Sequence, residues 1–77
     1  MEHFSYRDQQ LHAEGVNVSA IAEQVGTPTY VYSRAALESA LQEYQQALAG
    51  CPHLVCFAVK ANSNLAVLDT LARLGAG

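Results

Sequence analysis

Lys60 is the residue of this sequence that is best placed for covalent chemistry. It directly follows the continuous apolar run of residues 54–59, and Asn62, Ser63 and Asn64 come next. A lysine amine that is partly desolvated has its pKa lowered, and the neutral amine attacks an aldehyde to form a Schiff base. A single lysine at the end of a strand is more often a solvated charge that marks where burial stops. The pattern alone therefore leaves both interpretations open.

The other residue types that carry chemistry form no comparable site. The cysteines, Cys51 and Cys56, lack the density of a disulfide scaffold and the spacing of a zinc site. Cys56 lies inside the apolar run, which predicts a buried, inert thiol. His3, His12 and His53 are scattered along the chain, which argues against a metal site.

The first half of the chain reads as an arm, a short helix and a strand. Residues 1–15 are mixed and polar, and we expect an extended arm there. Ser19 is a suitable N-cap for a short helix over residues 20–25. Residues 29–32, Thr-Tyr-Val-Tyr, are β-branched or aromatic and predict a strand.

The second half predicts a helix, a covered strand and another helix. Ser33 is the expected cap of an amphipathic helix that follows it directly and ends near Gly50, with Leu37, Ala40, Leu41, Tyr44 and Leu48 at helical spacing. Residues 54–59 show no alternation, which is typical of a strand covered on both faces in a parallel sheet. Ser63 or Asn64 caps the last helix, which has Leu65, Leu68, Leu71 and Ala72 on one face and is closed by Gly75. Asn62 most simply satisfies backbone groups at this turn, and a contact with a bound cofactor is the alternative.

This order of elements indicates an α/β fold with a largely parallel sheet. Two strands cannot bury themselves in such a sheet, so we expect an incomplete fold that belongs to a larger protein. The 77 residues are 51% hydrophobic and only 14% charged, a composition that also suits part of a larger core.

Charge and hydropathy exclude several classes of partner. The formal net charge is −3, with four lysine and arginine residues in total. Nucleic-acid or anionic-membrane binding therefore lacks its electrostatic basis, and no apolar run has the ~18 residues of a membrane helix. With no signal peptide and few cysteines, we expect a cytoplasmic protein.

The string Phe-Ala-Val-Lys-Ala-Asn at residues 57–62 resembles the cofactor-lysine motif of the pyridoxal-phosphate (PLP) enzymes built on an alanine-racemase-like barrel. Residues 26–33, Gly-Thr-Pro-Thr-Tyr-Val-Tyr-Ser, and the earlier stretch from residue 4 to residue 22 are similar to the segment that opens diaminopimelate decarboxylases. The resemblance covers essentially the whole chain, in order and at compatible spacings.

The resemblance implies a fold, a cofactor and a reaction. Residues 1–32 would contribute to a β-domain, and residues 33–77 would be the truncated start of a PLP-binding (β/α)8 barrel. Lys60 would be both the catalytic and the cofactor-binding residue, and no metal is expected. The full-length enzyme would be a homodimer that decarboxylates meso-2,6-diaminopimelate, a small amino-acid substrate, to L-lysine and carbon dioxide. We expect the present segment alone to be inactive.

Two alternatives are kept. One retains PLP but changes the reaction, as in an ornithine- or arginine-type decarboxylase or an amino-acid racemase. The other is a non-catalytic α/β module, which should fold on its own.

Overall fold

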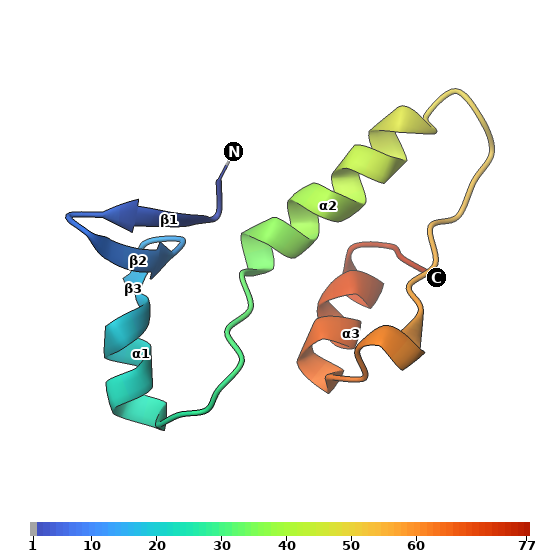
Figure 1. Cartoon of the computed structure of the whole chain (residues 1–77). Helices are drawn as coiled ribbons and strands as arrows, with labels where there is room; N and C mark the ends of the chain where they lie inside the picture. The colour runs from blue at the N-terminus through green and yellow to red at the C-terminus, as the bar shows by residue number, and fades with distance from the viewer. Residues whose placement is uncertain (1) are drawn as a thin grey trace. The chain divides into compact units, whose positions relative to one another are not determined.

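The structure is a computed structural model that describes residues 2–77, and it divides into two units, residues 1–36 and 37–77. The first unit contains a three-stranded antiparallel sheet in the order β1-β2-β3, followed by helix α1 (Figure 1). The second contains most of helix α2, a short 3-10 helix η1 and helix α3. Helices and strands are both present, so the expected α/β class is confirmed in this broad sense.

The expected arm is in fact a small sheet. Strands β1 (Phe4–Arg7) and β2 (Gln10–Ala13) pair with Phe4 opposite Ala13, and β3 (Val16–Asn17) adds to the other edge of β2. The two residues between β1 and β2 both have positive φ angles, 52° at Asp8 and 65° at Gln9. Two such residues in succession are typical of a tight hairpin turn, whose twist matches that of the flanking strands.

Helix α1 (Val18–Val25) begins earlier than the sequence predicted, and Ser19 is not its cap. The Asn17 side chain accepts a hydrogen bond of 2.8 Å from the Ser19 backbone N–H. Asn17 is itself the last residue of β3, so the strand passes directly into the helix. The prediction was wrong because asparagine is as good a cap as serine and stands two residues earlier.

The strand predicted over residues 29–32 is absent from the structure. The segment carries the right residue types, but no neighbouring chain forms a ladder with it, and strand propensity cannot supply a partner. At the end of this segment Ser33 caps α2 (Arg34–Ala47), as expected. Its hydroxyl accepts a 3.0 Å hydrogen bond from the Ala36 N–H and donates one of 3.1 Å to the Glu14 carboxylate.

The core of the second unit lies between α2 and α3 (Leu65–Arg73). Leu41, Val67 and Leu71 are buried in it, and five partly buried side chains pack against them: Leu37, Val55, Phe57, Leu74 and Ala76. The amphipathic spacing predicted both helices but only part of this core, because it did not include Val67, and Leu65, which it placed on the apolar face, is 81% exposed. Gly75 follows α3 with a φ of 96°, a left-handed conformation that favours glycine.

Residues 54–59 do not form the doubly covered strand that was expected. Only Val55 and Phe57 are half-buried. Leu54, which precedes Val55, and Cys56, which lies between the two, are exposed. The Gly77 N–H donates to the Val55 carbonyl at 2.8 Å, and the Phe57 N–H donates to the Gly77 carbonyl at 3.4 Å. This is the bonding pattern of a parallel bridge, but one bridge is not a ladder. The only sheet among the described residues is antiparallel.

Candidate active site

Lys60 lies at the centre of η1 (Val59–Ala61), a single turn that follows the extended segment. The turn is closed by a 3.0 Å bond from the Ala61 N–H to the Ala58 carbonyl and one of 3.1 Å from the Asn62 N–H to the Val59 carbonyl. Short 3-10 turns of this kind connect elements and redirect the chain. The lysine is therefore carried on a tight turn, not on the last residue of a regular strand.

Two asparagine side chains connect this turn to α3. The Asn62 side-chain oxygen accepts a hydrogen bond of 2.9 Å from the Asn64 N–H. The Asn64 side-chain oxygen accepts bonds of 2.9 Å from the Ala66 N–H and 3.2 Å from the Val67 N–H. Asn64 is thus the N-cap, which decides between the two predicted candidates, and Asn62 satisfies a backbone group at the turn as predicted.

The amine of Lys60 is open to solvent. Lys60 is exposed, and its side chain makes no hydrogen bond or ion pair with any part of the chain that the structure describes. Val59 beside it is 52% exposed. The partial desolvation expected from the sequence is therefore not found here, because residues 54–59 are covered on one face only. Lys60 is also the only lysine of the sequence.

The N-terminus of α3 offers little to an anion. Helix N-termini attract phosphate through unpaired N–H groups. Here the Asn64 side chain already occupies the N–H groups of Ala66 and Val67, and the Leu68 N–H donates to the Asn64 carbonyl at 3.0 Å. A phosphate group would have to displace this cap, so its binding groups are not expected at this end of α3.

The cysteines and histidines do not assemble into a second centre. Cys51 and Cys56 are free and exposed, so the prediction that Cys56 is buried was wrong. Cys56 is exposed because it lies on the face of residues 54–59 that is opposite to Val55 and Phe57, and only these two side chains pack against the core. The Nδ1 atoms of His12 and His53 lie 2.9 Å from the carbonyl oxygens of Gln10 and Cys51. Within residues 2–77 no three metal-binding side chains come together, and no helix is long and apolar enough to cross a membrane.

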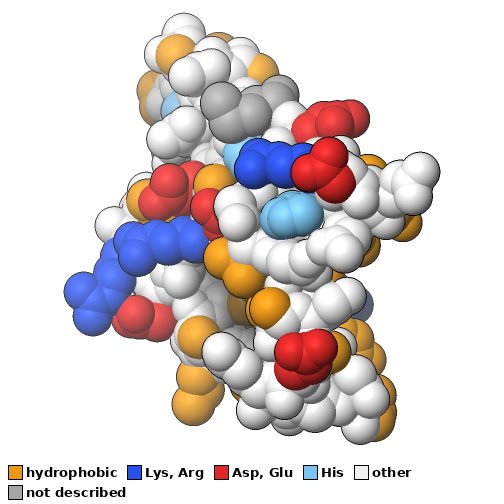
Figure 2. Space-filling model, turned by 90° about the vertical axis from the view of Figure 1, so that its left-hand side faces the viewer, with side chains coloured by type: hydrophobic (Ala, Val, Ile, Leu, Met, Phe, Trp, Pro, Cys, Tyr) orange, Lys and Arg blue, Asp and Glu red, His pale blue; other side chains and the backbone are white. Residues whose placement is uncertain are grey.

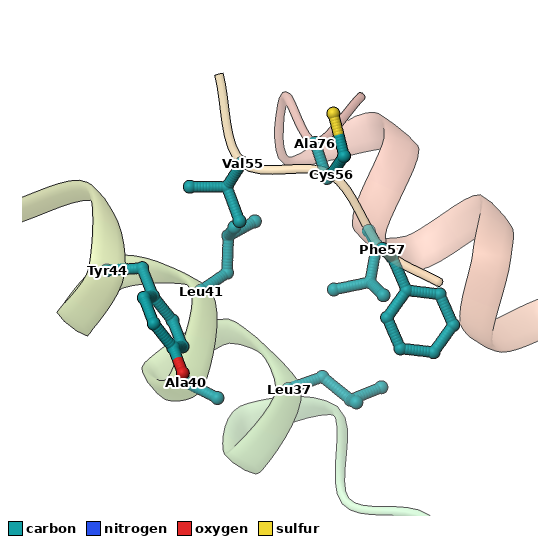
Figure 3. A pocket seen from close by; sticks show the side chains of 9 residues that line it. Leu37, Ala40, Leu41, Tyr44, Val55, Cys56, Phe57 and Ala76 are labelled. Carbon is teal, nitrogen blue, oxygen red and sulfur yellow. The ribbon is translucent and has the colours of Figure 1, made fainter. Parts of the chain in front are cut away.

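An apolar hollow of about 440 Å³ lies in the second unit, between α2 and residues 55–57 (Figure 3). In that view Val55 and Phe57 point to one side of the extended segment and Cys56 to the other. The hollow is lined by Leu37, Ala40, Leu41, Tyr44, Val55, Cys56, Phe57, Leu71 and Ala76. Lys60 is not among these residues, and neither is any other charged residue. The lining suits apolar side chains and not a phosphate-bearing ligand.

Charged side chains of both signs are exposed. On the face that Figure 2 shows, acidic groups lie beside the basic ones and no basic stripe is visible. Arg73 donates a 2.8 Å hydrogen bond to Asp69, one helical turn earlier. This hydrogen bond, and secondarily the charge of Asp69, raises the pKa of Arg73 above its ordinary value. The formal net charge of the sequence is −3.

The family to which this arrangement belongs is shown by comparison with known proteins. A family model described as "Pyridoxal-dependent decarboxylase, pyridoxal binding domain" matches residues 34–77, more than half of the chain. The matched region contains Lys60, its turn and both asparagines. The chain belongs to this family of pyridoxal-dependent decarboxylases.

Relatives that match the whole chain carry a more specific name. The chain is 70% identical over 77 residues to the diaminopimelate decarboxylase of Pseudomonas aeruginosa, and 55% identical over 78 aligned positions to that of Vibrio cholerae. It spans all of its own length but only 19% of the length of each relative. A crystal structure of a protein from Aquifex aeolicus is also similar, with 40% identity and a TM-score of 0.90. That match covers 97% of this chain and 18% of the solved one.

Proposed function

We propose that the protein containing this chain decarboxylates meso-2,6-diaminopimelate to L-lysine and carbon dioxide, with PLP carried on Lys60. The observation that carries the proposal is the family match over residues 34–77, because these residues contain Lys60. The relatives at 70% and 55% identity are named diaminopimelate decarboxylases, which favours this substrate over ornithine, arginine or alanine.

The residues present fit the cofactor at one point, the amine of Lys60. Its exposure and its freedom from ion pairs with the described residues leave Nζ accessible to an aldehyde. Bound PLP supplies an electron sink for the electrons that remain when a carboxylate leaves the substrate. Lys60 holds the cofactor covalently, and its Nζ must release a proton before it can attack, because only the neutral amine is nucleophilic.

The rest of the site is supplied from outside these residues. The Asn64 side chain accepts from the Ala66 and Val67 N–H groups at the start of α3, which leaves these donors unavailable to a phosphate. The groups that bind the phosphate, the pyridine nitrogen and the substrate carboxylate therefore belong to the remainder of the protein, and the isolated segment should be inactive.

We assign residues 1–32 to a β-domain and residues 33–77 to the start of a (β/α)8 barrel in a homodimeric enzyme. The antiparallel sheet within residues 4–17 and the start of the family match at residue 34 support this division. The parallel bridge from Gly77 to Val55 and Phe57, after an intervening helix, is the connection expected of a βαβ unit. The free cysteines suit a cytoplasmic location.

Borohydride reduction of the full-length protein with PLP tests the role of Lys60. The reduction fixes the pyridoxyl group on the amine that holds it, and peptide mass mapping should locate the label on Lys60. The variant Lys60→Arg keeps the positive charge and should carry no label at this position. A label on a different lysine of the wild-type protein would contradict the proposal.

The substrate is tested separately. We expect carbon dioxide release from meso-diaminopimelate to exceed release from ornithine or arginine, with no racemisation of alanine. A preference for ornithine or arginine would retain the cofactor assignment and reject the substrate. Racemisation without carbon dioxide release would reject the reaction.

A further inference from the structure

We infer that Asn62 is a positioning residue for Lys60, through the hydrogen bond that ties the lysine-bearing turn to α3. The inference rests on the proposed function, because it concerns how the cofactor amine is held. Asn62 itself need not touch the cofactor.

The lysine is not held in place by its own packing. Lys60 is exposed, and so are Ala58, Val59 and Ala61 around it. The two hydrogen bonds that close η1 join Ala61 to Ala58 and Asn62 to Val59. They fix the shape of the turn, but they do not fix where the turn lies relative to the core.

Helix α3, in contrast, is firmly anchored. Val67 and Leu71 are only 4% and 8% exposed and belong to the core cluster. Asn64 caps the helix, and its oxygen reaches the N–H of Val67, so the cap is bonded to one of the anchoring residues. A group that is hydrogen-bonded to the Asn64 backbone is therefore held at a fixed position relative to the core.

Asn62 makes the connection between these two parts. Its side-chain oxygen accepts from the Asn64 N–H, and its own N–H donates to the Val59 carbonyl. Asn62 is half-buried, whereas Lys60, Ala61, Ser63 and Asn64 are all exposed. One residue thus bonds backward to the turn and forward to the helix cap, with only Ser63 between them.

Loss of the Asn62 oxygen should loosen the turn without unfolding α3. The dihedral angles of Ser63 would then be free to vary, and the amine at the end of the long Lys60 side chain would move with the turn. A hydrogen bond of this kind contributes roughly 1 kcal/mol, so the fraction of molecules with a well-placed amine should fall on the order of tenfold at most.

The experiment uses the full-length protein and four variants. Asn62→Ala removes the acceptor, Asn62→Gln keeps the amide but makes it too long for the same ring, and Asn62→Asp keeps the acceptor oxygen. Asn17→Ala is the matched control, because Asn17 accepts an equivalent bond from the N–H two residues ahead, at the start of α1. PLP affinity and the rate of appearance of the visible absorbance band are measured for each, together with the thermal midpoint.

We expect Asn62→Ala and Asn62→Gln to weaken PLP affinity and slow the band several-fold, up to about tenfold. Asn62→Asp should recover both to within about twofold, because it keeps the acceptor oxygen. Asn17→Ala should lower the thermal midpoint yet leave both PLP measurements within about twofold of wild type.

The inference is overturned if Asn62→Gln binds PLP as the wild type does, or if Asn17→Ala impairs PLP binding as much as Asn62→Ala. Should Asn62→Ala fail to fold, the milder glutamine variant still decides. A wild-type protein that takes no borohydride label on Lys60 rejects the proposed function and the inference with it. A labelled wild type with unaffected Asn62 variants rejects the inference alone.

Discussion

Replacement of Ser33 by alanine should destabilise the start of α2 by roughly 1–2 kcal/mol. Ser33 is 3% exposed, and its hydroxyl makes two hydrogen bonds, one from the Ala36 N–H and one to the Glu14 carboxylate. Loss of a serine N-cap costs about 1 kcal/mol. The bond to a charged group adds to this, but only by about 0.5 kcal/mol, because Glu14 is exposed and water replaces the lost donor.

Native-state hydrogen exchange at the Ala36 amide is the sharpest assay of this loss. Without the serine oxygen the Ala36 N–H loses its acceptor and the first turn opens more often. Hydrogen exchange at this amide should therefore accelerate about 5- to 30-fold. Urea unfolding of the full-length protein reports the global effect. Ser19→Ala is the matched control, because Ser19 is exposed and its hydroxyl is not the cap of α1.

The two bonds of Ser33 can be separated with a second substitution. Glu14→Gln keeps an acceptor oxygen but removes the charge, so it should cost less than Ser33→Ala. The double variant should lose less than the sum of the two single losses, because both substitutions affect the same bond. Acceleration at the Ala36 amide below about twofold in Ser33→Ala would refute the capping role and the magnitude derived from it.

Three further outcomes follow from the same structure. Asn17→Ala should destabilise α1 by about 1 kcal/mol in hydrogen exchange, while Ser19→Ala stays within about 0.5 kcal/mol of wild type, and equal effects would reject the observed cap. Val67→Ala, at a position only 4% exposed, should cost roughly 2 kcal/mol by urea unfolding, whereas Leu65→Ala, at 81% exposure, should cost under about 0.5 kcal/mol. Asp69→Asn should lower the urea midpoint only slightly near neutral pH, because both side chains of this ion pair are exposed and water screens the attraction. The raised pKa of Arg73 means that the small contribution is present at pH 7 and is lost only as the pH rises through that pKa. A clear fall in that midpoint near pH 7 would show that this exposed ion pair contributes more than its geometry indicates.

The parts of the fold that were predicted correctly depend on residues close together in sequence. The amphipathic spacing of α2 and α3 predicted both helices, Ser33 was predicted as a cap, and Asn64 was one of the two caps predicted for α3. These features require no information beyond one or two helical turns. The same holds for Asn62, whose bond spans two residues.

The hairpin of β1 and β2 was missed because its turn uses uncommon residues. A two-residue turn with positive φ at both positions favours Asn-Gly or Asp-Gly, but here it is Asp8-Gln9. The alternation of Phe4 and Tyr6 with polar neighbours suggested extended chain without a reason to fold back. The hydrogen bond between Ser33 and Glu14 joins residues that are 19 positions apart, and the sequence around either residue gave no indication of it.

The surroundings of Lys60 show the limit of a sequence pattern most clearly. The apolar run of residues 54–59 indicates that these side chains favour burial, but it does not indicate which segments would cover them. Among the described residues, α2 and α3 cover only the face of Val55 and Phe57, and one bridge from Gly77 pairs one edge. Lys60 was singled out by its local motif, whereas the desolvation inferred for it depended on chain distant in sequence. The turn that carries Lys60 is thus defined by hydrogen bonds among residues close in sequence, whereas burial of its amine would require contacts that residues 2–77 do not supply.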